Sequence, residues 1–314
     1  MKIDVIIPIY KPGPELFTLL DKLEAQSVRA ENIILMNTGK KYFEALIEGM
    51  AFADKYPNVK VYHLTKKEFD HGTTRRQAVG YCQGEVFVMM TQDAMPADPF
   101  LLERLVEGLS GTVAVAYARQ LAGSDSSELE KVSRMFNYPE HSQVKTKADL
   151  KNMGIKTFFC SNVCAAYRRD VYEELGGFVG HTIFNEDMIY AAGAIRANYG
   201  VAYVAKARVV HSHNYTNICQ LRRNFDLGVS QAQHPEVFGA VTSEAEGKRF
   251  VKAAWGYFKK GRQLYKFPGF CLQCGFKYAG YLLGKHYDRL PRSLVLRLTT
   301  NKEYWERHEK DTYT

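Results

Sequence analysis

Short apolar runs alternate with segments of helical periodicity through the first third of the chain, and this alternation limits the fold more than any other feature. The apolar runs cover residues 3–9, 32–37, 59–64 and 86–90, and leucines recur at helical spacing between residues 15 and 26. Such an order predicts an α/β fold with a parallel, doubly wound sheet. Neither a Gly-x-Gly-x-x-Gly motif nor a Walker lysine loop follows the first run. The sequence therefore argues against the usual binding sites for NAD and ATP.

The length and composition are typical of a folded cytoplasmic protein. The chain has 314 residues, 46% of them hydrophobic, which is enough for one large or two modest domains. It starts directly with a strand-like segment and has no run of about 18 uncharged apolar residues, so we expect neither a signal peptide nor a membrane span. Six scattered cysteines favour a reducing compartment, and Cys271-x-x-Cys274 lacks the second pair of a zinc ribbon.

The positive charge is concentrated near the carboxyl end. Residues 248–302 contain thirteen lysines and arginines and a single acidic residue, Asp288, within a total net charge of +8. Aromatic residues such as Trp255, Phe258 and Tyr278 are interspersed among the basic ones. Helices of this composition suit an anionic bilayer surface, and a self-association surface remains the alternative. No nucleic-acid-binding motif accompanies them, so we expect no nucleic acid partner.

The fourth apolar run ends abruptly in polar residues. Thr91, Gln92 and Asp93 follow residues 86–90 directly. Ligands of open α/β sheets gather at the carboxyl ends of such strands, where a lone carboxylate can hold a divalent cation against a diphosphate. The alternative is that Asp93 caps a helix beginning near Pro99.

A second polar motif opens a helix between the third and fourth runs. Gly72 and Thr73 offer backbone N–H groups to an anion, and Arg75 or Arg76 can pair with phosphate. A helix capped by its own residues, with exposed arginines, is the alternative interpretation.

Two further features suggest proton transfer and metal binding. Glu186 and Asp187 open a helix, where one carboxylate can take a proton from a hydroxyl during an inverting transfer, although acids also favour helix N-termini. His211 and His213 end an apolar strand at residues 200–210 and suggest metal ligation.

Taken together, four motifs resemble a known family. They are Pro8-Ile-Tyr10, Asn37-Thr38-Gly39, Asp70-His71-Gly-x-x-Arg75 and Thr91-Gln92-Asp93-Ala94. Their order and spacing, from Lys2 to about Val229, resemble the inverting family 2 glycosyltransferases of GT-A fold, and most of all the rhamnosyltransferases that use dTDP-L-rhamnose. The family often has Asp-x-Asp as its metal motif, whereas Thr91 occupies the first position here. Asp93 would then be the main carboxylate on the metal.

The resemblance implies a role for each matching residue. Asp187 would be the catalytic base, with Glu186 beside it, and Mg²⁺ or Mn²⁺ would be held by Asp93 and His211, with His213 as the second choice of histidine. The implied donor-binding residues are Pro8, Tyr10, Asn37, His71, Arg75, Gln92, Asp93 and Arg223. On the acceptor side the resemblance implies Asn162, in a strand predicted over residues 158–169, and Gln220 of the Gln220-x-x-Arg223 element.

These inferences predict a Rossmann-like nucleotide-sugar domain over residues 1–240, with a mixed central sheet, and a helical, basic C-terminal region over 241–314. The resemblance implies transfer of L-rhamnose from dTDP-L-rhamnose, or second a sugar from a UDP-sugar. The acceptor would be a glycan on a polyprenyl-linked precursor of a cell-wall or surface polysaccharide, at the inner face of the cell membrane. The alternative is a non-catalytic subunit that binds nucleotide sugar or lipid in a polysaccharide assembly complex. A sugar-nucleotide-forming nucleotidyltransferase lacks its expected Gly-rich basic loop.

Overall fold

The computed structural model describes residues 1–239 and 244–306, and its contacts divide them into two compact units. The first unit comprises residues 1–121, 140–180 and 186–211. The second comprises residues 122–139 and 181–185 together with the chain from Ser212 onward. The two units therefore interleave along the sequence. The predicted domain boundary between residues 240 and 241 lies outside the described residues.

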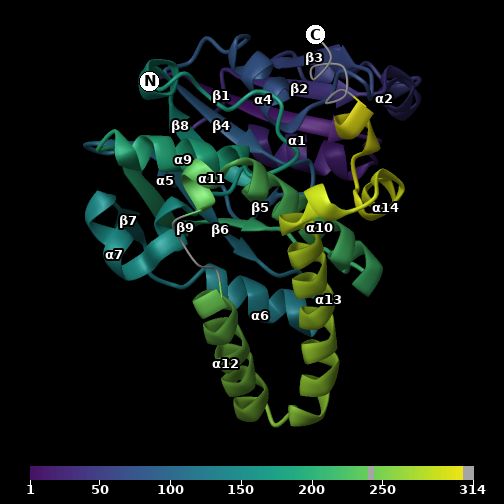
Figure 1. Ribbon diagram of the computed structural model, residues 1–314. Helices are drawn as coiled ribbons and strands as arrows, with labels where there is room; N and C mark the ends of the chain where they lie inside the picture. Colours follow the sequence, from purple (N-terminus) through teal and green to yellow (C-terminus); the bar gives the residue numbers. More distant parts are fainter. Residues whose placement is uncertain (240–243, 307–314) are drawn as a thin grey trace. The chain divides into compact units, whose positions relative to one another are not determined.

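One nine-stranded mixed sheet forms the centre of the first unit. Its order is β3-β2-β1-β4-β8-β6-β9-β5, and β7 pairs with β9. The strands are β1 (Ile3–Tyr10), β2 (Asn32–Thr38), β3 (Val59–Leu64), β4 (Val86–Met90), β5 (Met95–Pro96), β6 (Val113–Leu121), β7 (Gln143–Lys145), β8 (Cys164–Arg168) and β9 (Gly200–Val210). The first four are parallel, as predicted, and β1, β2 and β4 lie side by side (Figure 1). Strand β8 runs antiparallel between β4 and β6 and makes the sheet mixed, which confirms the predicted fold class.

Shorter helices connect the strands of this unit. They are α1 (Glu15–Glu24), α2 (Lys40–Ile47), α3 (Phe52–Lys55), α4 (His71–Val79), α5 (Leu101–Glu107), α7 (Leu150–Met153), α8 (Arg169–Glu174) and α9 (Glu186–Arg196), with 3₁₀ turns η1 (Lys147–Asp149) and η2 (Gly154–Phe158). The predicted strand over residues 158–169 is correct only for its second half. The chain turns at Ser161, whose carbonyl accepts a hydrogen bond from the N–H of Cys164, before β8 begins.

A buried aspartate ties the amino ends of three parallel strands together. Asp4, in β1, is 0% exposed. Its Oδ1 accepts hydrogen bonds from the backbone and side-chain nitrogens of Asn32, at 3.1 and 2.8 Å, and its Oδ2 accepts from the N–H groups of Gln83 and Gly84 at 2.6 and 2.7 Å. A buried carboxylate needs such partners because its desolvation is costly. Asp4 therefore fixes the end of the sheet opposite the predicted site.

Helices make up the second unit in the described part of the chain. They are α6 (Glu128–Asn137), α10 (Asn217–Gln233), α11 (Pro235–Phe238), α12 (Glu244–Lys260), α13 (Phe267–Lys285) and α14 (Arg292–Leu298), with η3 (Leu264–Lys266) and η4 (Tyr287–Arg289). The long helices α12 and α13 lie side by side (Figure 1). Phe258 and Phe270 from this pair pack with Leu129 and Val132 of α6. The predicted C-terminal helical region is thus confirmed where the structure describes it.

Helices α10 and α13 approach each other closely because glycines line their contact. A Cβ at Gly280 would lie 2.1 Å from the carbonyl oxygen of Leu221, and one at Gly284 would lie 2.1 Å from that of Phe225. A side chain at either position would push the backbones apart. Over the described ranges, none of the helices combines the length and the hydropathy that crossing a membrane would require.

Candidate active site

The carboxyl ends of β1 and β4 are tied by one side-chain amide. The Oε1 of Gln92 accepts a hydrogen bond from the N–H of Tyr10 at 2.9 Å, and its Nε2 donates to the Tyr10 carbonyl at 3.2 Å. This paired contact extends the ladder between the neighbouring parallel strands beyond Met90. Gln92 therefore fixes the backbone next to Asp93, while its predicted contact with a donor stays a prediction.

Asp93 and His211 meet at the ends of β4 and β9. The Nε2 of His211 lies 3.4 Å from Oδ1 of Asp93. Strand β5 holds them near each other, because Met95 and Pro96 pair with Val210 and Val209. Helix α5 begins at Leu101, and the N–H of Phe100 donates to Oδ1 of Asp98 at 3.0 Å. Asp93 is therefore not the cap of that helix, and the alternative interpretation is wrong.

A buried glutamine orients His211. The Nδ1 of the histidine lies 3.1 Å from Oε1 of Gln120, whose Nε2 donates to Ser161 Oγ at 2.9 Å. Because an amide oxygen only accepts, Nδ1 carries the proton in this contact, and Nε2, on the side of Asp93, is the nitrogen that would offer its lone pair to a cation. A carboxylate oxygen and an imidazole nitrogen oriented by a partner of this kind suit Mn²⁺ or Mg²⁺. The residues present thus fit a divalent cation.

Glu186 is held in its ionised form by a buried network. It begins α9 and is 5% exposed. Its Oε1 lies 3.3 Å from Nε of Arg75 and accepts a hydrogen bond from Nδ2 of Asn162 at 3.0 Å. Burial alone would raise the pKa of Glu186, but the charges of Arg75 and His71 and the bond from Asn162 lower it below its ordinary value. This carboxylate therefore carries a negative charge at neutral pH.

Asp187, the next residue, has the opposite electrostatic setting. Its Oδ2 accepts a hydrogen bond from the N–H of Asn162 at 2.9 Å, and its Oδ1 accepts from the N–H of Met188 at 2.8 Å. Burial, followed by the adjacent charge of Glu186, raises the pKa of Asp187 to about 7. Paired carboxylates whose pKa values are driven apart are typical of acid–base sites. Asp187 can therefore accept a proton near neutral pH.

Helix α4 is capped by its own aspartate. Oδ1 of Asp70 accepts hydrogen bonds from the N–H groups of Gly72 and Thr73, at 3.0 and 2.9 Å. The expectation that these two N–H groups bind an anion is therefore wrong, because a carboxylate of the chain already occupies them. Arg75 is not exposed as the capping interpretation supposed. It is 6% exposed and also donates to the carbonyl of His71 at 3.0 Å.

The residues predicted to frame the donor base differ in exposure. Tyr10 ends β1 with 37% of its side chain exposed, and its ring meets Tyr42 edge-on at 6.0 Å. Asn37, the last residue but one of β2, is 0% exposed, and its Nδ2 lies 2.8 Å from Nδ1 of His63. Pro8 precedes Tyr10 by two residues and is partly exposed. Only Tyr10 of the three presents a large open face.

Two predicted residues belong to the second unit. Gln220 and Arg223 lie on α10, where Gln220 is buried. The guanidinium of Arg223 lies 4.8 Å from the ring centre of Tyr215 and 5.7 Å from that of Phe184. Their roles toward donor and acceptor stay predictions.

Sequence reasoning missed Gln120 and Tyr167. Gln120 orients His211, and the hydroxyl of Tyr167 donates to Oδ1 of Asn162 at 2.7 Å. Gln120 lies in β6 and Tyr167 in β8, and the sequences of both strands are typical of an ordinary buried strand. A polar residue near the end of an otherwise apolar strand is the signal that could have indicated Gln120.

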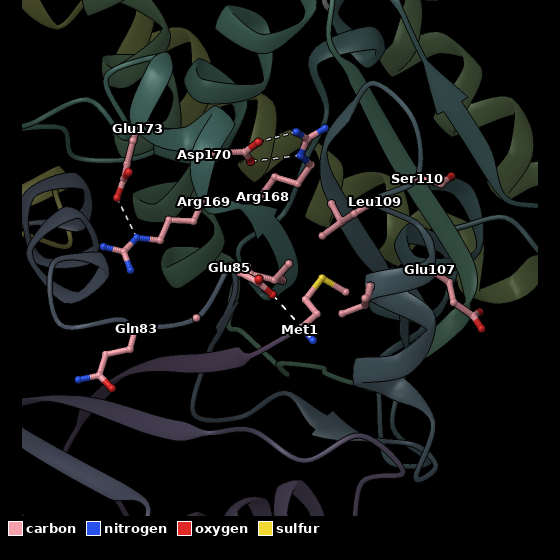
Figure 2. Close-up of a pocket in the computed structure, with 13 residues that line it drawn as sticks. Met1, Gln83, Glu85, Glu107, Leu109, Ser110, Arg168, Arg169, Asp170 and Glu173 are labelled. Atoms are coloured by element: carbon pink, nitrogen blue, oxygen red, sulfur yellow. Dashed lines mark hydrogen bonds and ion pairs between the residues drawn. The ribbon is translucent and has the colours of Figure 1, made fainter.

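A separate hollow of about 850 Å³ in the first unit contains none of the predicted site residues (Figure 2). It lies near Met1 and Glu85, which precede β1 and β4, and so at the amino ends of these strands. Four of its charged side chains form ion pairs, Arg169 with Glu173 at 2.8 Å and Arg168 with Asp170. The hollow lies at the opposite ends of these strands from the predicted site.

Comparisons with known proteins point to one family. The model of the glycosyl transferase family 2 matches residues 4–176. The O-antigen chain rhamnosyltransferase RfbN of Salmonella typhimurium is 40% identical over 310 residues, covering 97% of this chain and 96% of its own. The O-antigen chain rhamnosyltransferase WbaN of Salmonella anatum is 41% identical over 258 residues, covering 81% of each.

A solved structure shares the fold. A mannosyltransferase from Pyrobaculum calidifontis, solved in complex with GDP-Man and Mn²⁺, superposes with a TM-score of 0.62 at 14% identity, covering 92% of this chain and 88% of its own. At this identity the likeness concerns the fold alone. It agrees with the predicted GT-A arrangement of a mixed sheet.

Proposed function

This chain belongs to glycosyl transferase family 2, and on that footing we propose that it is an O-antigen chain rhamnosyltransferase. The family and the enzyme class follow from the match over more than half of the chain. The sugar and the polymer are inferred from the two relatives that are about 40% identical over most of their length. The donor we propose is dTDP-L-rhamnose, with a UDP-sugar as the second choice.

Asp187 is the proposed catalytic base. In an inverting transfer, the acceptor oxygen forms a bond to the anomeric carbon while the bond from that carbon to the diphosphate oxygen breaks. The nucleoside diphosphate leaves with the electron pair of that bond, and the acceptor proton passes to a carboxylate. A pKa raised to about 7 suits Asp187 to this task. This raised pKa, next to an ionised Glu186, is the single observation that carries the proposal.

Glu186 supports the base and does not replace it. Its contact with Arg75 and its bond from Asn162 keep it ionised, and its charge raises the proton affinity of Asp187. Asn162 also donates its backbone N–H to Asp187. One asparagine thus positions both carboxylates, which is a positioning role beside the acceptor contact that the resemblance implies.

Asp93 and His211 would hold Mg²⁺ or Mn²⁺, and His213, two residues farther along the chain, would offer another imidazole. A cation bound there supplies positive charge to the leaving diphosphate. The exposed ring of Tyr10 would stack on the nucleobase, with Pro8 and Asn37 near the ribose. Arg223 would add charge to the diphosphate, and Gln220 would contact the acceptor.

The proposed acceptor is the growing O-antigen glycan on a polyprenyl-linked carrier. We place the transfer at the inner face of the cytoplasmic membrane, because the basic, aromatic helices α12 and α13 suit an anionic surface. Self-association through the same helices is the competing interpretation. Sedimentation of the purified protein with and without anionic vesicles distinguishes the two.

The experiment is a transfer assay with purified protein, dTDP-L-rhamnose and a lipid-linked acceptor. We expect transfer in the presence of Mg²⁺ or Mn²⁺ and its near-complete loss in Asp187→Asn. A non-catalytic subunit would bind nucleotide without turnover on any acceptor. Transfer from a UDP-sugar but not from dTDP-L-rhamnose would retain the enzyme class and overturn the donor.

A further inference from the structure

A hollow of about 960 Å³ lies among α10, α12 and α13 of the second unit. Apolar and aromatic side chains form most of its wall, among them Leu227, Phe250, Trp255, Phe267 and Tyr278. Most of these side chains are at least partly exposed, with Trp255 at 47% and Tyr278 at 53%. An aromatic hollow of this size is a setting for an apolar chain.

The charges that the described residues bring to this wall are all of one sign. Lys248, Lys252 and Lys277 line the hollow, and among the residues whose side chains the structure describes, every ionised one in the wall is a lysine. Lys248 and Lys252 are four residues apart on α12, and therefore lie on one face of that helix. The hollow thus joins an apolar surface to three cationic groups.

Lys277 is the half-buried one of the three. Its Nζ lies 5.9 Å from the ring centre of Phe250, and in the described part of the chain it forms neither an ion pair nor a hydrogen bond. Glu130, the carboxylate whose charge acts on it, is itself paired with Arg134. Burial lowers the pKa of Lys277. An ammonium group desolvated without a counter-charge is unfavourable, and an anionic ligand would offset that cost.

We propose that this hollow binds the phosphate-bearing end of the polyisoprenyl carrier to which the acceptor glycan is attached. The proposal rests on the proposed function, because it names the lipid part of that acceptor. Three lysines can balance the negative charges of a diphosphate, and a single methyl-branched chain matches an aromatic hollow. A bilayer phospholipid keeps two chains in the membrane and meets a protein surface with its headgroup, so it would leave the apolar wall of the hollow uncovered.

Trp255 makes the binding measurable. The chain has two tryptophans, and the other, Trp305, is 3% exposed. Farnesyl diphosphate is a water-soluble probe that carries both features of the ligand. We expect it to change the fluorescence of the full-length protein saturably, and Trp255→Phe to abolish the signal. Lys277→Met should weaken the binding of farnesyl diphosphate by at least about tenfold, the equivalent of one lost charge-assisted contact. Its binding of farnesol should stay unchanged.

Lys259→Met is the matched control, because Lys259 is exposed on α12 and does not line the hollow. It should bind farnesyl diphosphate as the wild type does. Equal binding by Lys277→Met and the wild type would overturn the proposal, as would the absence of saturable binding. Lysophosphatidic acid that binds as tightly as farnesyl diphosphate would show phospholipid to be the ligand and would overturn it as well.

A transfer assay separates this proposal from the proposed function. Lys277→Met should raise the KM for a polyprenyl-linked acceptor and leave transfer to the same glycan without lipid unchanged. Equal effects on both acceptors would contradict the carrier site. Wild-type protein that transfers sugar to neither acceptor, while farnesyl diphosphate still binds, would contradict the proposed function and not the hollow.

Discussion

The acidic pair that begins α9 and the Asp93–His211 pair at the ends of β4 and β9 both contain an aspartate, but the surroundings of the two aspartates differ. Glu186 is enclosed by Arg75 and Asn162, and its charge helps to raise the pKa of the neighbouring Asp187 to about 7. Asp93 keeps 37% of its side chain exposed and faces an oriented imidazole. Partners and burial, more than residue type, therefore suit one carboxylate to the proposed proton transfer and the other to the proposed cation binding.

The largest effect should come from the base itself. Asp187→Asn keeps the shape of the side chain but cannot take a proton, so we expect sugar transfer to fall about 10³-fold. The affinity for dTDP, measured by calorimetry, should stay unchanged. Asp54→Asn, which alters an exposed acid of the same unit, should transfer sugar at the wild-type rate. A wild-type rate in Asp187→Asn would remove the proposed base.

Replacing His211 tests the proposed role of the Asp93–His211 pair in cation binding. His211→Ala removes the imidazole that faces Asp93, so less positive charge would reach the leaving diphosphate. Transfer at fixed Mn²⁺ should fall on the order of 10²-fold. Binding of dTDP should weaken only when Mn²⁺ is present. His141→Ala, at an exposed histidine, is the control. A rate that falls equally with and without added metal would mean that His211 has no part in a cation site.

Gln120 should act on the cation only through His211. Gln120→Leu removes the acceptor for Nδ1 of the histidine, so the ring loses its fixed tautomer and orientation. We expect the dissociation constant for Mn²⁺ to rise about tenfold. Gln120→Glu keeps an acceptor oxygen and should restore most of the affinity. If both variants bind Mn²⁺ like the wild type, Gln120 does not orient a ligand.

A smaller effect should follow from removing the hydrogen bond of Tyr167 to Asn162, the residue that contacts both carboxylates of the acidic pair. Tyr167→Phe removes the hydroxyl that donates to Asn162 and leaves a buried amide oxygen without that bond. The free energy of unfolding should fall by about 1–2 kcal/mol, measured by urea titration. Tyr199→Phe, which removes a surface hydroxyl bonded to Glu174, should cost less. Equal losses would indicate that the network around Asn162 adds no rigidity.

Much of the sheet could be predicted because most of its strands are indicated by short local patterns in the sequence. Residues 32–37 and 86–90 are apolar runs between turn residues, and both form buried strands. The order β4-β8-β6-β9 depends on long-range pairing that no short pattern records. That order brings Gln120 of β6 to His211 after β9, and so the sequence did not indicate the contact.

The sequence indicated which residues form the candidate site, but it indicated less well which groups those residues contact. Glu186 and Asp187 were indicated by their place at a helix start, and Asp93 by its place after a strand. The predicted contact of Arg75 with phosphate stays a prediction, whereas its position against Glu186 was not predicted, because it depends on how α4 and α9 meet in the folded unit. The cap at Asp70 competes for the same N–H groups that an anion would use, and the local sequence allowed both outcomes.

The most direct test of the central claim is the pH dependence of sugar transfer in the wild type and in Glu186→Gln. The wild-type rate should rise with pH as Asp187 loses its proton, about tenfold for each pH unit, and level off near its apparent pKa of about 7. Burial raises that pKa most and the charge of Glu186 adds to it, so Glu186→Gln should move the rising limb to lower pH without removing it. A rate that is flat between pH 5 and 9, or a limb that stays in place in Glu186→Gln, would contradict the account.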